Sequence, residues 1–105
     1  MVRILVLAAL LVIAKAGLSI GDEIKINQAN KTFAPGDVTV KSGDTLDFVN
    51  DDSIAHNIIT RGSPEDFNLG VIKPGDDKKT TLIAPGVYDV RCAIHPGMKL
   101  KVTVQ

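Results

Sequence analysis

The chain has 105 residues, 45% of them hydrophobic and 23% charged. This length suits one small globular domain and excludes a multidomain enzyme. Twelve basic residues balance twelve acidic ones, which excludes the positive excess by which proteins bind nucleic acids. With three phenylalanines, one tyrosine and no tryptophan, the chain also offers little surface on which bases could stack.

The N-terminal segment has the pattern of a secretory signal peptide. A basic start is followed by an uninterrupted apolar run over residues 4–14 and then by Ala14-Lys15-Ala16. This run is well short of the ~20 residues that cross a bilayer, although an uncleaved leader would leave the protein membrane-anchored. We therefore predict a signal peptide over residues 1–16, a domain over residues 17–105 with a net charge of −2, and a periplasmic location without membrane attachment.

Beyond this leader, short alternating runs separated by turn residues predict a β protein. No window of ten or more residues keeps apolar side chains at helical spacing, and Pro-Gly, Gly-Asp and Asn-Asp pairs stand between the runs. About seven to eight short strands at this spacing predict an all-β, two-sheet Greek-key sandwich. The least regular stretch is Arg61–Lys73, where Pro64–Phe67 suits one helical turn. The expected strands are Glu23–Asn27, Asp37–Lys41, Thr45–Asn50, Ile54–Thr60, Thr80–Ala84, Val87–Cys92 and Lys99–Val104.

The alternation within the strands indicates which side chains face the core, because successive residues point to opposite faces. Cys92 shares its face with Tyr88 and Val90, so its thiol should point inward. His56 has the same parity as Ile58, so its imidazole should be at least half buried. The paired acidic residues, such as Asp51-Asp52, flank turns, where exposure to solvent explains them.

Near the C-terminus, a Cys-x-x-His-x-x-Met run offers a thiolate, an imidazole and a thioether from one loop. The three side chains are Cys92, His95 and Met98, and Pro96-Gly97 reverses the chain between the last two. Together with His56 they complete two histidines, one cysteine and one methionine, the donor set of a blue copper site. Each residue alone would be explained by packing, and zinc is the main metallic alternative, but zinc makes little use of a thioether.

Residues 22–105 resemble the cupredoxins, the blue copper proteins of the plastocyanin, pseudoazurin and amicyanin group. Two residues between the cysteine and the histidine, and two between the histidine and the methionine, resemble the short loop of amicyanin. The resemblance implies that one copper ion is bound by His56, Cys92, His95 and Met98. It rests on Phe33-Ala34-Pro35, the run Val40–Asn50, His56-Asn57 and the run Gly86–Met98.

Three positions depart from the family pattern: Ala55, Ala93 and Ile94. The change after the cysteine matters most, since the resemblance implies that Asn57 hydrogen-bonds a hydroxyl at that position. Ala93 has no hydroxyl, so we expect this support of the ligand loop to be weaker or to use backbone groups.

The resemblance implies a small soluble carrier that passes single electrons between periplasmic redox proteins, with a dehydrogenase or a c-type cytochrome as partner. We expect a monomer, with His95 at the solvent edge and the apolar loop residues Ile94, Pro96 and Gly97 as a docking patch. We do not expect an enzyme, because copper catalysis normally requires an open position or a second metal site, and the sequence has no spare histidine cluster.

Two other functions remain open from the sequence. The soft ligands would also suit a copper chaperone or buffer that delivers or stores Cu(I). A metal-free sandwich used for adhesion would make Cys92 incidental. An intense blue colour with Cu(II) separates the electron carrier from both.

Overall fold

The computed structural model describes residues 21–105, in which nine β-strands and no helix are found. The predicted signal peptide and residues 17–20 of the predicted domain lie outside this range. Within residues 21–105, no helix has the length and apolar character needed to span a membrane. The strands are β1 (Glu23–Ala29), β2 (Thr32–Ala34), β3 (Val38–Val40), β4 (Thr45–Asn50), β5 (His56–Thr60), β6 (Asn68–Ile72), β7 (Asp77–Thr81), β8 (Gly86–Cys92) and β9 (Lys99–Val104).

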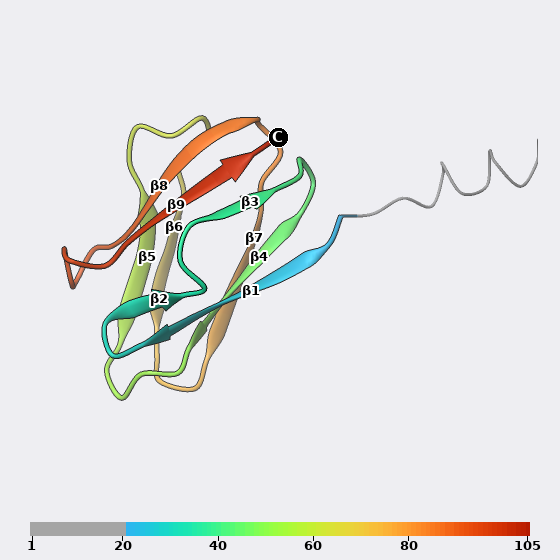
Figure 1. Ribbon diagram of the computed structural model, residues 1–105. Helices are drawn as coiled ribbons and strands as arrows, with labels where there is room; N and C mark the ends of the chain where they lie inside the picture. Colours follow the sequence, from blue (N-terminus) through green and yellow to red (C-terminus); the bar gives the residue numbers. More distant parts are fainter. Residues whose placement is uncertain (1–20) are drawn as a thin grey trace, which may run out of the picture.

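The strands form two sheets that pack face to face (Figure 1). The four-stranded sheet has the order β2-β1-β4-β7 and the five-stranded sheet the order β3-β9-β8-β5-β6. Both sheets are mixed, because β1 runs parallel to β4 and β3 runs parallel to β9 while the other pairs are antiparallel. The predicted all-β sandwich is confirmed.

The structure corrects three details of the predicted strands. β2 and β6 were not expected, and the strand expected at Thr80–Ala84 lies earlier, as β7. β7 reads Asp-Lys-Lys-Thr-Thr and is mostly exposed at the edge of its sheet, so it lacks the apolar alternation that marks a strand in a sequence. The helical turn suggested at Pro64–Phe67 is also wrong, since this segment consists of bends and irregular chain.

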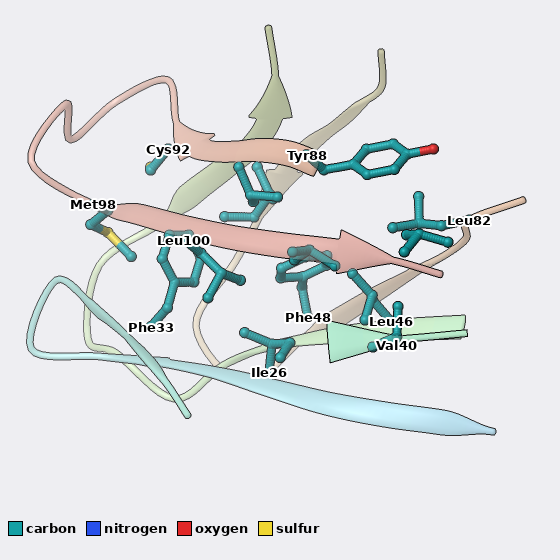
Figure 2. Close-up of a cluster of buried hydrophobic side chains, with 14 of the residues drawn as sticks. Ile26, Phe33, Val40, Leu46, Phe48, Leu82, Tyr88, Cys92, Met98 and Leu100 are labelled. Carbon is teal, nitrogen blue, oxygen red and sulfur yellow. The ribbon is translucent and has the colours of Figure 1, made fainter. Parts of the chain in front are cut away.

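The core lies between the sheets and follows the predicted parity. Cys92 is 2% exposed and shares the buried face of β8 with Tyr88 and Val90. Figure 2 shows this cluster, in which Cys92 and Met98 lie at the same end and Leu82 and Val40 lie at the other. The buried apolar residues are Ile26, Phe33, Val40, Leu46, Phe48, Ile58, Ile72, Leu82, Tyr88, Val90, Cys92, Met98, Leu100, Val102 and Val104.

The β1–β2 turn, the β4–β5 loop and the β8–β9 loop lie at the end of the sandwich that is away from the C-terminus (Figure 1). The β1–β2 turn has Asn30 and Lys31 at φ values of 52° and 56°, the left-handed pair of a type I′ hairpin turn. The β4–β5 loop contacts this turn through Asp52, whose Oδ2 accepts the Lys31 N–H at 2.9 Å. The candidate ligands lie at this end.

Candidate metal centre

Two of the predicted ligands are brought together by the pairing of β5 with β8. His56 is the first residue of β5 and Cys92 is the last residue of β8. The two strands run antiparallel with Ile58 opposite Cys92, so His56 and Cys92 lie at the same end of the pair. The His56 Nδ1 atom is 3.6 Å from the Cys92 Sγ atom.

The β8–β9 loop adds the third predicted ligand. The His95 Nδ1 atom is 3.8 Å from the Cys92 Sγ atom, and the two imidazole rings are 5.0 Å apart at an interplanar angle of 66°. The donor atoms of His56, Cys92 and His95 all lie within 4.8 Å of one another. Three side chains that are separated by up to 39 positions in the sequence thus face a common point.

Met98, the fourth predicted ligand, lies at the end of the same loop. Its N–H donates to the carbonyl of His95 at 3.0 Å, which closes the turn between these residues. Its side chain is 1% exposed and belongs to the core cluster. Figure 2 shows the Met98 thioether at the end of the core where Cys92 lies.

The donor separations match those that a single metal ion requires. Metal–nitrogen bonds of about 2.0–2.1 Å and metal–sulfur bonds of about 2.3 Å, at angles between tetrahedral and trigonal, separate the N and S atoms by about 3.5–3.8 Å. The two observed separations are 3.6 and 3.8 Å. Two imidazoles, a thiolate and a nearby thioether are the donors that copper uses in electron-transfer sites. The residues present therefore fit a copper ion.

Burial differs between the two histidines. His56 is fully buried, Cys92 is 2% exposed and His95 is half-buried. The loop around His95 is open to solvent: Ala93, Pro96 and Gly97 are exposed, and the Ile94 side chain is 49% exposed. This arrangement agrees with the expectation that His95 lies at the solvent edge and His56 in the interior.

Backbone groups hold the cysteine, as expected from the alanine that follows it. The Asn57 N–H donates to the Cys92 Sγ atom at 3.5 Å, and the Ala93 N–H donates to the Asn57 carbonyl at 2.8 Å. The Asn57 Oδ1 atom is buried and makes no hydrogen bond with any of the residues the structure describes. The side-chain bond that a hydroxyl at position 93 would supply is therefore missing, while the backbone bonds remain.

A carboxylate that the sequence analysis missed contacts the first histidine. The Asp52 Oδ2 atom lies 3.0 Å from the His56 Nε2 atom. The Lys31 N–H and the His56 ring hold the pKa of Asp52 below its ordinary value. Its interpretation as a solvent-exposed turn charge is wrong, because its side chain is only 12% exposed. Its spacing of four residues from His56 was the one available signal.

Asn50 fixes the loop that carries this carboxylate. Its buried Nδ2 group donates to the carbonyls of Ile54 at 2.9 Å and Ile72 at 2.8 Å. Its Oδ1 atom accepts the Asp52 N–H at 2.9 Å. One fully buried amide thus connects the end of β4, the loop before His56 and the end of β6.

Comparisons with known proteins agree with this geometry. The family model described as copper binding proteins of the plastocyanin/azurin family matches residues 21–105. A chloroplastic plastocyanin from Oryza sativa subsp. indica is 34% identical over 85% of this chain and 66% of its own length. Amicyanin-alpha from Methylorubrum extorquens is 30% identical over 79% of this chain and 71% of its own length.

Solved structures give the same result. The reduced state of an amicyanin mutant has a TM-score of 0.72 at 28% identity and matches 79% of this chain and 82% of the amicyanin chain. A copper-containing nitrite reductase from Thermus scotoductus has a TM-score of 0.74 at 26% identity, but the match covers only 22% of the reductase chain. By its sequence, its two-sheet fold and its cluster of imidazole and thiolate donors, the chain belongs to the plastocyanin/azurin family of copper-binding proteins.

Proposed function

We propose that this protein is a one-electron carrier in which His56, Cys92, His95 and Met98 bind a single type 1 copper ion. The observation that carries the proposal is the placement of the Cys92 Sγ atom within 3.6 and 3.8 Å of two imidazole Nδ1 atoms. When bound there, copper would supply the Cu(I)/Cu(II) couple. The assignment of these four ligands is part of the proposal.

The residues around the site favour electron transfer because they restrict ligand movement. His56 is enclosed by the core, and Cys92 ends a strand that is hydrogen-bonded to β5 on one side and β9 on the other. Close-packed interiors resist deformation. Ligands held in this way keep one geometry for both oxidation states, so little reorganisation accompanies the gain or loss of an electron.

The exposed side of the site offers a place for a redox partner to dock. His95 is half-buried and is surrounded by the apolar loop residues Ile94, Pro96 and Gly97. An exposed apolar patch of this kind suits a transient complex between proteins. We propose that electrons enter and leave through the His95 ring.

The predicted signal peptide and the family support a proposal for the cellular setting. We propose a periplasmic location and a monomer that exchanges electrons with redox proteins such as a dehydrogenase or a c-type cytochrome. The relatives named plastocyanin and amicyanin support a carrier rather than an enzyme. The chain spans 66% of the rice plastocyanin.

The test is titration of the metal-free protein with Cu(II), followed by optical and paramagnetic resonance spectra. We expect an intense blue thiolate-to-copper absorption that ascorbate bleaches and that the Cys92→Ser variant lacks. Met98→Leu is the matched control, since it should keep the colour while shifting the reduction potential. Reduction of the blue protein by a periplasmic dehydrogenase, or its oxidation by a c-type cytochrome, would then identify a partner.

A copper chaperone or buffer is the alternative, and the same titration separates the two functions. A chaperone should bind Cu(I) without an intense charge-transfer band and lose it quickly to a chelator. A colourless Cu(II) form with rapid Cu(I) exchange would overturn the electron carrier. If the protein takes up neither Cu(I) nor Cu(II), both copper functions fail.

A further inference from the structure

The contact between Asp52 and His56 has a geometry that a surface ion pair would not have. The His56 ring is completely buried, the Asp52 side chain is 12% exposed, and Nε2 lies 3.0 Å from Oδ2. The other ring nitrogen, Nδ1, faces the Cys92 Sγ atom at 3.6 Å. The imidazole is therefore positioned between a carboxylate and the candidate metal centre.

The carboxylate is itself fixed by other groups. Its Oδ2 atom also accepts the Lys31 N–H at 2.9 Å, from the β1–β2 turn. Its Oδ1 atom accepts the Ser53 N–H at 3.1 Å, and the Asn50 amide holds its backbone. Because several bonds from different elements set its orientation, Asp52 can in turn set the orientation of the ring.

We propose that Asp52 is a positioning residue for the copper site: it accepts the His56 Nε2–H, keeps Nδ1 free to bind the metal, and lowers the reduction potential. This inference rests on the proposed function and adds to it a residue outside the ligand set. The functional role belongs to the hydrogen bond between the Asp52 carboxylate and the His56 ring.

The physical reason is the effect of an anionic acceptor on a metal-bound imidazole. Hydrogen bonding of the distal N–H to a carboxylate fixes the tautomer and makes the other nitrogen a stronger donor. A stronger donor stabilises Cu(II) more than Cu(I), because the more highly charged ion gains more from it. Asp52 should therefore favour the oxidised state.

Three variants separate the hydrogen bond from the charge. Asp52→Asn can present its amide oxygen to the His56 and Lys31 N–H groups, which keeps these two bonds, loses the bond from the Ser53 N–H and removes the charge. Asp52→Ala removes both the bond and the charge. Asp51→Asn removes an equal charge from the adjacent exposed position and is the matched control.

The first readout does not depend on copper. In the metal-free protein, ¹⁵N NMR of His56 should show the Nε2–H tautomer in the wild type and in Asp52→Asn, and a mixture of both tautomers in Asp52→Ala. An Nδ1–H tautomer in the wild type would overturn the proposal. This result stands even if the protein binds no copper, so failure of the inference can be distinguished from failure of the proposed function.

The second readout is the reduction potential of the copper protein. Removal of an outer partner of a metal-binding histidine typically changes metal affinity at least tenfold. If the affinity for Cu(II) falls tenfold relative to the affinity for Cu(I), the reduction potential rises by about 59 mV. We expect a rise of this size for Asp52→Ala, a smaller rise for Asp52→Asn and almost none for Asp51→Asn. Equal shifts in the two asparagine variants, or no shift in Asp52→Ala, would refute the role. Urea unfolding of the metal-free variants checks that each remains folded.

Discussion

Substitution of Asn50 by alanine tests how far one buried amide supports the candidate metal centre. The change removes the two bonds from Nδ2 to the carbonyls of Ile54 and Ile72, and the bond from the Asp52 N–H to Oδ1. Each such bond contributes about 1 kcal/mol net to stability, and a buried carbonyl left without a donor adds about 1–3 kcal/mol to the loss. We therefore expect Asn50→Ala to lower the free energy of unfolding by about 4–6 kcal/mol.

The assay is urea unfolding of the metal-free protein, followed by far-UV circular dichroism and analysed by linear extrapolation. Asn27→Ala is the matched control, because Asn27 lies on the neighbouring strand β1 and its Oδ1 atom is buried without a hydrogen-bond partner among residues 21–105. The same truncation there should lower the free energy of unfolding by less than about 1 kcal/mol. A loss for Asn50→Ala that is no larger than that for Asn27→Ala would refute the reasoning.

The same variant should also weaken copper binding, for a separate reason. Asn50 holds the backbone of Asp52, and Asp52 contacts the His56 ring. When this loop is free to move, His56 has to be ordered each time a metal binds, and this ordering opposes binding. Competition with a Cu(I) chelator should show a lower affinity in Asn50→Ala and an unchanged affinity in Asn27→Ala.

Three further predictions concern single side chains. Burial, together with the nearby carboxylate of Asp77, raises the pKa of Asp47. The stability that the Asp47 side chain contributes therefore falls as the pH rises through that pKa. Asp47→Asn should raise the melting temperature at about pH 7, where the aspartate is charged, but not at about pH 3. Ala93→Ser should raise the stability of the metal-free protein by about 1 kcal/mol if the new hydroxyl reaches the unpaired Asn57 Oδ1 atom, and an unchanged melting temperature would contradict this. Met98→Leu should lower stability by less than about 1.5 kcal/mol, since the two side chains have similar volumes. Voltammetry should show a higher reduction potential, because the variant lacks the thioether that would donate to copper; an unchanged potential would exclude Met98 as a ligand.

The sequence was sufficient to predict the strands whose two faces differ. β4, β8 and β9 lie where the alternation placed them, and the Cys92 thiol points inward as its parity indicated. β2 has three residues, too few for an alternation to be recognised. β6 contains Gly70 at φ 75°, and its pairing with β5 is interrupted by a bulge, so neither composition nor periodicity marks it as a strand.

In the candidate site, too, some residues could be predicted from the sequence and one could not. The four candidate ligands were predicted because cysteine, histidine and methionine are rare in this chain and three of them share one loop. Asp52 was missed because its neighbour Asp51 is the same residue type, and a spacing of four residues from His56 indicates a contact only within a helix, which this segment is not. The β1–β2 turn, 21 positions earlier, places the Lys31 N–H beside one of the two carboxylates. Only the tertiary fold shows which of the two aspartates has that partner.

The candidate metal centre is thus built from two parts with different roles. The segment from Asn50 to Asn57 fixes one half, since it supplies the loop bonds, the Asp52 contact to His56 and the N–H that donates to the Cys92 Sγ atom. The β8–β9 loop supplies His95 and Met98 and is largely exposed between them. The first half is packed into the sandwich, so changes there alter both stability and metal binding. Changes in the exposed loop should alter the reduction potential of the copper protein and the proposed docking surface while the fold stays intact.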